Sequence, residues 1–292
     1  MTKKISIIGD LIIDEDKFLK NIGTSLETPN LKGYLSETKT RIGGAGNILS
    51  SLNELGHKPY LFSIIGKDYY ELVSKKLSFN GSLKKVNKNS TIKTRYWGNS
   101  YKLLQVNQNL IVSDSEKKKL IKDSLGIIFK NKISKLIISD YDNIFYSSDL
   151  IKLFYKKLFT YDYKKIDIYI DSQFSSTFRN NKFNYSNYYI FNLREYKEVC
   201  RSFMIDDKLN DQSLKKIMKK LNIQNRIIVK LGSKGSLSFD GINIYESKLK
   251  NKKQIHDTSG AGDYFLAAYV SSNDNEYNKL KFSNNFAFKK IL

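Results

Sequence analysis

The segment His256-Asp257-Thr258-Ser259-Gly260-Ala261-Gly262-Asp263 stands directly before an apolar run, Tyr264–Val270, that has helical spacing. Small side chains over 259–262 allow the backbone to turn tightly into that helix. Its first amides then point outward at the positive end of the helix dipole. The segment therefore predicts an anion site at a helix N-terminus, with the carboxylate of Asp263 in the first helical turn.

Outward main-chain amides beside a carboxylate are the arrangement that in-line phosphoryl transfer requires. Amides over 260–262 would neutralise the oxygens of the transferred group, and Asp263 would accept the proton of the attacking hydroxyl. The structural alternative is a glycine-rich turn whose aspartate only complements the helix dipole. Such a cap needs one small residue and not four, so we favour the chemical interpretation.

Two rival nucleotide motifs are not matched. The sequence contains no G-x-x-x-x-G-K-[ST], which excludes a P-loop enzyme. A dinucleotide fingerprint needs three glycines directly after the first strand. Here Gly260 and Gly262 lie late in the sequence, and Phe265 stands where the third glycine should be.

A second glycine-rich run, Gly43-Gly44-Ala45-Gly46-Asn47, leads into a helical pattern over 45–55. It permits a ligand to approach the backbone closely, and the amide of Asn47 is able to bond sugar hydroxyls. A turn that starts a helix and binds nothing explains the same residues equally well when they are considered alone.

Strand-like apolar runs alternate with helical patterns, which is the rhythm of a mostly parallel sheet covered by helices on both faces. The expected strands are Ile5–Ile8, Tyr60–Ile65, Leu136–Ser139, Ile166–Ile170, Tyr188–Phe191 and Ile227–Lys230, with a hairpin over Ser236–Phe239 and Ile242–Tyr245. The expected helices are 45–55, 113–130, 148–158, 194–203, 211–221, 260–271 and a last one at 284–290. The sequence thus predicts an α/β fold.

Two polar segments, residues 15–40 and 90–107, break this rhythm. They alternate like strands yet are too solvated for the main sheet. We interpret them as a small β-sheet lid on a single domain that spans residues 1–292.

The composition limits the classes of partner. The 292 residues hold 50 Lys and Arg against 29 Asp and Glu, a formal net charge of +21. Only six of the basic residues are arginines and the lysines are scattered, so we expect a solvated surface and no nucleic-acid partner. A polyanion-binding protein is the alternative. No apolar run approaches 18 residues, so we expect no membrane partner. The single Cys200 fits a reducing compartment and a cytoplasmic location.

Together, Gly43–Asn47 and Asp257–Asp263 resemble the two motifs of the ribokinase, or PfkB-type, carbohydrate kinases. The resemblance covers essentially the whole chain. Within that family the sequence is most similar to the heptose-7-phosphate kinase domain of ADP-heptose synthesis, on segments such as Thr91-Ile92-Lys93 with Arg95 and Ser139-Asp140-Tyr141. The resemblance implies a ribokinase-like three-layer sandwich with a lid. It also implies a kinase that uses ATP and Mg²⁺ to phosphorylate a sugar or a sugar phosphate, for which a heptose phosphate is a candidate.

The resemblance also assigns residues to the catalytic centre and the acceptor. It implies that Asp263 is the general base, and that the anion hole is formed by Gly260, Ala261 and Gly262. Contacts to the hydroxyls of the acceptor are implied for Asp14, Gly43, Gly44 and Asn47.

On the ATP side the resemblance implies two elements. One is Asn192-Leu193-Arg194-Glu195, in which Glu195 would hold Mg²⁺ through water. The other is the glycine loop after a late strand, with Lys230, Gly232 and Gly235. Many relatives have a monovalent cation beside the position of Asp257, so K⁺ is a candidate ligand of that carboxylate.

Two lysines of the heptose kinase pattern are absent, because Tyr141 is followed by Asp142-Asn143 and Asp171 by Ser172-Gln173. Two alternatives therefore stay open. One is a kinase fold retained as a binding or regulatory protein, and the other is a nucleoside kinase of the same fold. Lids of this fold often pair across dimers, so a homodimer through the lid is also a hypothesis.

Overall fold

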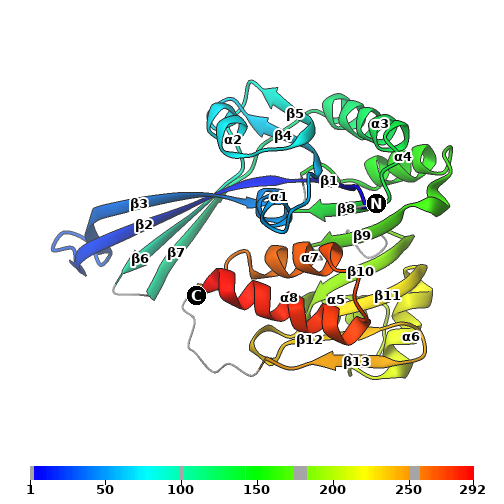
Figure 1. The fold of residues 1–292 in the computed structure, drawn as a ribbon. Helices are drawn as coiled ribbons and strands as arrows, with labels where there is room; N and C mark the ends of the chain where they lie inside the picture. The colour runs from blue at the N-terminus through cyan, green and yellow to red at the C-terminus, as the bar shows by residue number, and fades with distance from the viewer. Residues whose placement is uncertain (1–2, 99–100, 142, 174–182, 250–256) are drawn as a thin grey trace.

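The computed structural model describes residues 3–98, 101–141, 143–173, 183–249 and 257–292. Within them the main sheet runs in the order β13-β12-β11-β10-β9-β8-β1-β4-β5 (Figure 1). Neighbouring strands from β11 to β5 are parallel, and β12 and β13 complete one edge in the antiparallel sense. The strands are β1 (Ile5–Gly9), β4 (Tyr60–Gly66), β5 (Asn80–Val86), β8 (Lys135–Asp140), β9 (Asp167–Ser172), β10 (Ser186–Asn192), β11 (Ile223–Lys230), β12 (Ser236–Phe239) and β13 (Ile244–Ser247).

Helices cover both faces of this sheet and form a three-layer sandwich. One face carries α3 (Asp114–Lys130), α4 (Ser148–Leu158), α5 (Leu193–Ser202) and α6 (Asp211–Lys220). The other carries α1 (Ala45–Glu54), α2 (Tyr70–Lys76), α7 (Ala261–Ser271) and α8 (Glu276–Ile291). Successive side chains of a strand point to opposite faces, so Ile7 joins the core under α1 and α7, whereas Ile8 joins the core under α3 and α4.

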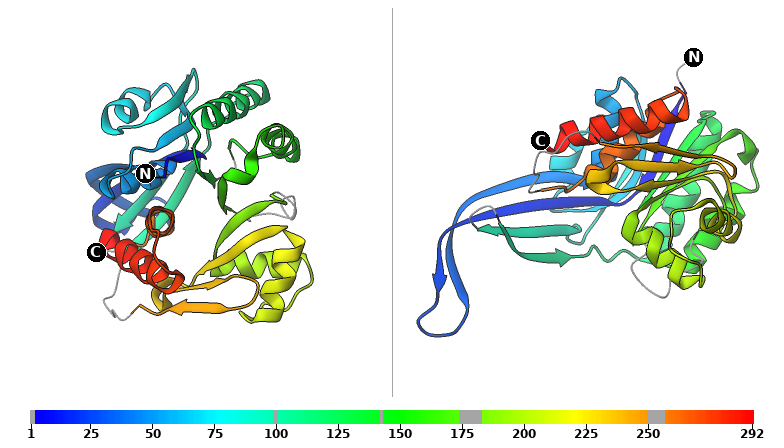
Figure 2. Two further views of the ribbon diagram at one scale, coloured as in Figure 1. Left: turned by 45° about the vertical axis from the view of Figure 1, so that its right-hand side comes forward. Right: turned by 90° about the horizontal axis from the view of Figure 1, so that it is seen from below.

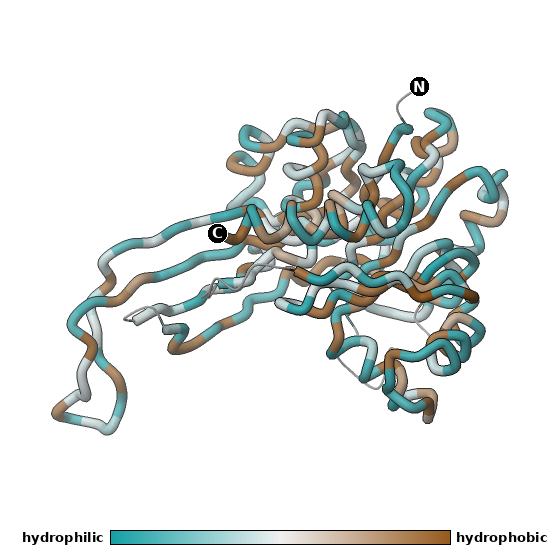
Figure 3. The backbone as a smooth tube through the Cα atoms, turned by 60° about the horizontal axis from the view of Figure 1, so that its bottom comes forward, coloured by the Kyte–Doolittle hydropathy of each residue, from teal (hydrophilic) through white to brown (hydrophobic). Residues whose placement is uncertain are grey.

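A second sheet, in the order β3-β2-β6-β7, projects from the body of the molecule (Figure 2). Its strands are β2 (Leu11–Thr24), β3 (Leu31–Gly44), β6 (Ile92–Gly98) and β7 (Tyr101–Gln108). The base of β2 is buried in the body, and its tip is exposed with the tip of β3. We call this four-stranded arrangement the acceptor sheet, because it carries Asp14 and Gly43, for which the sequence predicts contacts to an acceptor. Along its strands, hydrophilic stretches are interrupted by shorter hydrophobic ones (Figure 3).

The α/β fold predicted from the sequence is confirmed, with several differences in detail. The strand expected to start the lid at residue 15 already begins at Leu11, and the last helix begins at Glu276 instead of 284. Helix α2 and strand β5 were not predicted, because both are polar and lysine-rich at one edge of the sheet. None of the helices in the described ranges is long and apolar enough to cross a membrane.

Candidate functional site

Asp263 lies where three elements converge. It sits in the first turn of α7 and is 4% exposed. Asn47 of α1 donates from its side-chain amide to Oδ2 at 2.9 Å, and the Tyr141 hydroxyl, just beyond β8, donates to Oδ1 at 2.8 Å. Both carboxylate oxygens are therefore held by neutral donors, which fixes the direction in which the carboxylate points.

The surroundings of Asp263 bring the pKa of its carboxyl close to neutral pH. Burial raises the pKa of this carboxyl to about 6, because the charged form loses hydration. The hydrogen bonds from Asn47 and Tyr141 lower the pKa and oppose that rise, and the charge of Asp171 adds to it. A carboxylate with a pKa near 6 is ionised at neutral pH and is still basic enough to take a proton from a hydroxyl.

The turn before α7 has its own internal bonds. The Ser259 amide donates to Asp257 Oδ1 at 3.0 Å, and the Ala261 amide donates to the Thr258 carbonyl at 3.1 Å. Gly260 has a φ of 80°, and a Cβ there would lie 2.6 Å from the Asn47 amide nitrogen. The position therefore requires glycine. Since the Ala261 amide is already bonded, an anion at this turn would meet the amides that follow it.

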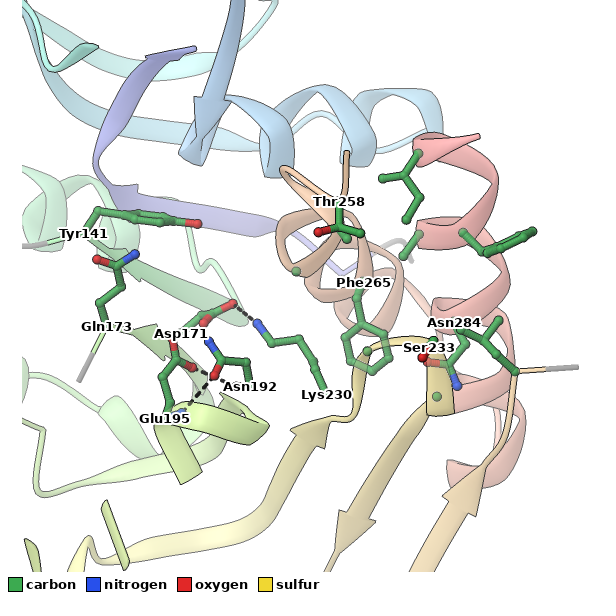
Figure 4. A pocket seen from close by; sticks show the side chains of 18 of the residues that line it. Tyr141, Asp171, Gln173, Asn192, Glu195, Lys230, Ser233, Thr258, Phe265 and Asn284 are labelled. Atoms are coloured by element: carbon green, nitrogen blue, oxygen red, sulfur yellow. Dashed lines mark hydrogen bonds and ion pairs between the residues drawn. The ribbon is translucent and has the colours of Figure 1, made fainter. Parts of the chain in front are cut away.

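A cavity of about 610 Å³ opens beside this turn (Figure 4). Of the residues predicted from the sequence, those lining it are Asn192, Glu195, Lys230, Gly232, Gly235, Ala261 and Gly262. Leu193 and Arg194 do not line it. The Arg194 side chain is 88% exposed and pairs with Glu198 along α5. Residues of the wall to which the sequence assigned no role include Tyr141, Asp171, Phe265, Asn284 and Phe288.

Charged groups meet on the floor of this cavity. Lys230 Nζ lies 2.8 Å from Asp171 Oδ2 (Figure 4), and a Cβ on Gly262 would stand 3.0 Å from the same ammonium. The ammonium of Lys230 thus lies beside the turn before α7, where the sequence predicts an anion site. Burial alone would lower its pKa, but Asp171 and Glu195 raise it, so the group stays charged.

Asn192 and Glu195 cap the start of helix α5 and also line the cavity. They form a capping box at the start of α5, in which the backbone amide of Asn192 donates to Glu195 Oε2 at 2.7 Å. Burial raises the pKa of Glu195 to about 7, with Lys230 opposing the rise and Asp171 adding to it. A cation in the cavity would favour the ionised form of this carboxylate further.

Asp14, for which the sequence predicts a contact to the acceptor, lies at the base of the acceptor sheet. It is 8% exposed on β2, and Arg95 of β6 donates to its Oδ1 at 2.8 Å. Gly43 lies directly against the other carboxylate oxygen, where a Cβ would clash, and Gly44 has a φ of 60°. The two glycines thus allow the end of β3 to pass close to Asp14 before α1 begins.

Arg41 and Asp16 continue this polar face along the acceptor sheet. The Arg41 guanidinium bonds both Asp16 and, at 3.0 Å, Oδ2 of Asp257. Asp16 is buried and also accepts from the Trp97 indole N–H at 2.7 Å. The carboxylate proposed from the sequence as a K⁺ ligand is therefore bonded to an arginine of the acceptor sheet.

Lys93 of β6 is a further cation near Asp14 and Tyr141. It is the register neighbour of Asp14, and its ammonium lies 4.9 Å from the centroid of the Tyr141 ring. Burial lowers its pKa, and the charges of Asp14 and Asp263 oppose that effect. Among the described residues, no carboxylate lies within ion-pair distance of this ammonium, whereas Arg95 and Arg41 are both paired.

Asp10 holds the backbone of Tyr141 in place. Its buried carboxylate accepts the backbone amides of Tyr141, Asn143 and Ile144 at 2.7 to 3.1 Å. The turn after β8 is therefore fixed to the end of β1, and with it the hydroxyl that bonds Asp263. His256 and Asp142, both considered in the sequence, lie outside the described residues. In the described ranges, no three His, Cys, Asp or Glu side chains cluster closely enough to hold a metal by themselves.

Comparison with known proteins adds a family to this geometry. The model of the pfkB family of carbohydrate kinases matches residues 2–282. The chain is 27% identical to the "Bifunctional protein HldE" of Sulfurimonas denitrificans, over 97% of this chain and 59% of that protein. An "Uncharacterized sugar kinase" of Buchnera aphidicola is 24% identical over 92% of this chain and 83% of that protein. The chain spans less than two thirds of the HldE proteins that it matches.

Solved structures agree on the fold. A ribokinase from Thermotoga maritima superposes with a TM-score of 0.77 at 19% identity, over 99% of this chain and 93% of that one. Phosphofructokinase-2 of Escherichia coli, in complex with fructose-6-phosphate, superposes with a TM-score of 0.75 at 15% identity, over 100% and 94%. At these identities the likeness concerns the ribokinase-like fold.

Proposed function

Because the chain belongs to the pfkB family of carbohydrate kinases, we propose that it transfers the γ-phosphoryl group of ATP to a hydroxyl of a sugar or sugar phosphate. One observation carries the proposal. Asp263, a buried carboxylate with a pKa near 6, directly follows Gly262, which lines the cavity that holds the predicted nucleotide residues, and bonds Asn47 of the glycine-rich run that ends β3. The reaction class is phosphotransfer with an alcohol as acceptor.

In this reaction the acceptor hydroxyl lies against Asp14, the 43–44 turn and Asn47. Its oxygen attacks the γ-phosphorus while the bond from phosphorus to the bridging oxygen of ADP breaks, and the proton passes to Asp263. Asn47 and Tyr141 hold the carboxylate so that it is oriented before the acceptor binds. Catalysis is then mainly positioning and electrostatic stabilisation.

The transferred phosphoryl group would meet positive charge from two directions. The amides at the start of α7 form one side, and the Lys230 ammonium, adjacent to Gly262, forms the other. Such preorganised donors stabilise the charge that develops on the phosphoryl oxygens. Asp171 keeps Lys230 charged and fixed in place at 2.8 Å.

The donor set fits a magnesium ion delivered with ATP. Mg²⁺ in nucleotide sites is bound through one or two carboxylates together with phosphate oxygens and water. Glu195 lines the cavity, and burial raises its pKa to about 7 although Lys230 opposes the rise, so a further cation would favour its ionised form. Glu195 would hold the ion through water, and the ion when bound would neutralise phosphate charge.

The acceptor in this proposal carries an anionic group in addition to its hydroxyl, as a heptose phosphate would. Lys93 supports this, because its ammonium lies near Asp14 and Tyr141 and has no carboxylate within ion-pair distance among the described residues. A half-buried ammonium that forms no direct ion pair is stabilised when a phosphate binds. Lys93 thus offers an anion contact even though two lysines of the heptose kinase pattern are absent.

The experiment is a substrate panel. ADP release is measured with neutral sugars, sugar phosphates and nucleosides, and Asp263→Asn gives the background for each. We expect sugar phosphates to raise turnover furthest above that background. If no member of the panel exceeds the mutant, the protein is a binding protein with a kinase fold. If nucleosides alone do so, the acceptor class is wrong.

A second part of the proposal is a homodimer through the acceptor sheet. Strands β3 and β7 expose apolar side chains to solvent, including Leu31 at 67% and Leu104 at 55%. An apolar sheet surface of this kind is typical of an interface. Light scattering should give twice the mass of the chain, and Leu104→Lys should shift it toward the monomer. A monomeric mass for the wild type would refute this part.

A further inference from the structure

The turn before α7 is anchored to the acceptor sheet by one arginine. Arg41 of β3 bonds Asp257 Oδ2 at 3.0 Å, while Oδ1 of the same carboxylate accepts the Ser259 amide at 3.0 Å. Asp257 and Arg41 are 216 residues apart in the sequence. The same nitrogen, Nη2, also donates to Asp16, which is buried. One nitrogen of Arg41 therefore bridges two carboxylates.

This geometry does not fit a monovalent cation on Asp257. Each oxygen of the carboxylate already accepts a hydrogen bond, and the partner of Oδ2 carries a full positive charge. A cation at that oxygen would stand beside a like charge, which is unfavourable at such short range. The hydrogen bonds from Ser259 and Arg41 outweigh burial and keep the pKa of Asp257 low, and the pKa of Arg41 is raised by its partners.

We propose that the guanidinium of Arg41 supplies the positive charge that orders the turn before α7, so that phosphoryl transfer by this protein needs no K⁺ or Na⁺. This inference rests on the proposed kinase function. Arg41 is a positioning residue in this view, because it acts on the anion site only through Asp257 and the turn that Asp257 organises.

Because the positive charge belongs to Arg41 of β3, the turn before α7 is coupled to the acceptor sheet, which a dissolved ion would not achieve. Arg41 is the register partner of Asp14 across β2 and β3. The strand pair that contacts the acceptor in the proposed function therefore also carries the residue that holds the turn before α7. Asp257, Ser259 and Gly260 then keep their arrangement only while the acceptor sheet holds its place. The guanidinium of Arg41, which is part of the chain, thus connects the acceptor sheet to the turn before α7.

The test compares alkali cations with a bulky cation that cannot enter a protein site. ADP release by the full chain is measured with Mg·ATP and the best acceptor of the panel, in KCl, NaCl or tetramethylammonium chloride at equal ionic strength. Wild type should be equally active in all three. Arg41→Ala should lose activity in tetramethylammonium chloride and regain it in KCl by roughly fivefold or more, the lower end of ordinary coupling between sites. Arg41→Lys should fall between the two.

Lys39→Ala is the matched control. Lys39 lies two residues away on the same strand and pairs with Glu37, so its loss removes the same charge without touching Asp257. It should behave as wild type in every salt. Activation of the wild type by K⁺ of roughly fivefold or more would overturn the inference, as would an Arg41→Ala variant that stays fully active in tetramethylammonium chloride.

A binding measurement separates this inference from the kinase proposal. Calorimetry with a non-hydrolysable ATP analogue and Mg²⁺ should give one affinity for the wild type in KCl and in tetramethylammonium chloride. If no acceptor supports turnover, the proposed function fails, and this titration still decides the inference. A wild-type affinity that depends on K⁺ would overturn it even if Arg41→Ala could not be folded.

Discussion

The two ends of the segment from Asp257 to Asp263 carry the same kind of side chain in opposite environments. Asp263 is buried, accepts from the neutral donors Asn47 and Tyr141, and has a pKa raised to about 6. Asp257 is only partly buried, pairs with Arg41, and has a lowered pKa. Only five residues lie between a group suited to taking a proton and a group suited to holding a backbone turn.

The difference shows that the partners of a carboxylate decide its chemical use. Neutral donors orient Asp263 without removing its basicity, because they stabilise the charged form far less than an ion pair does. A guanidinium does the reverse at Asp257, where it makes the carboxylate a permanent anion and an anchor. Exchanging the kinds of partner would exchange the roles, and four predictions test this contrast.

The largest effect should come from removing one carboxylate at a time. Asp263→Asn should lower kcat by between ~10² and ~10⁴, the usual contribution of a positioned base, because the amide cannot accept the hydroxyl proton. Asp257→Asn should cost much less, because its amide oxygen can still accept the Ser259 amide. Steady-state ADP release measures both. Binding of an ATP analogue should survive Asp263→Asn, and equal losses of kcat in the two variants would contradict the division of roles.

Of the two ends of the segment, only Asp263 should titrate near neutral pH. Below its pKa of about 6 the carboxyl is protonated and cannot act as a base, so kcat/KM should fall about tenfold per pH unit below pH 6. Glu195, with a pKa of about 7, should add its own dependence above pH 6. Asp257, with its lowered pKa, should stay ionised throughout that range. The measurement is a pH profile of kcat/KM in a buffer of constant ionic strength. A level profile down to pH 4.5 would argue against Asp263 as the base.

Much of this contrast could be predicted from the sequence, but only at the level of motifs. The small residues at 259–262 and the apolar run after them predict the turn, the helix and the carboxylate in its first turn. The run Gly43–Asn47 predicts the facing turn. These features are local, so their residue types and spacing are sufficient to find them.

The partners could not be predicted, because they come from distant strands. Nothing near Tyr141 indicates that its hydroxyl reaches α7, and Arg41 meets Asp257 only after the acceptor sheet has formed. The same limit explains α2 and β5. These elements lie at the edge of the sheet, where lysines and polar residues replace the apolar pattern that marks a buried strand.

A smaller effect should follow from a change in the middle of the segment. Gly260→Ala places a Cβ in a left-handed conformation, which costs about 1–2 kcal/mol, and pushes it toward the Asn47 amide. The melting temperature should fall, and activity should fall further than stability because Asn47 also holds Asp263. Gly241→Ala is the control, since Gly241 also has a positive φ but no neighbour within 4 Å of the added carbon. Equal losses of activity in the two variants would show that Asn47 is not disturbed.

The smallest effect concerns a group that interacts with the Asp263 end alone. Lys93 is influenced by the charges of Asp14 and Asp263 and is stacked over Tyr141, and its ammonium has no carboxylate partner among the described residues. Lys93→Met keeps the length of the side chain and removes the charge.

The KM for a phosphorylated acceptor should rise by roughly tenfold, the value of one hydrogen bond to a charged group, while the KM for a neutral sugar should hardly change. The acidic limb of the pH profile should also move upward, because removing a nearby cation disfavours the ionised form of Asp263. Lys102→Met is the matched control, since Lys102 lies over Trp97, away from Asp263. If Lys93→Met raised both KM values equally, the ammonium would serve the shape of the site and not the charge of the acceptor.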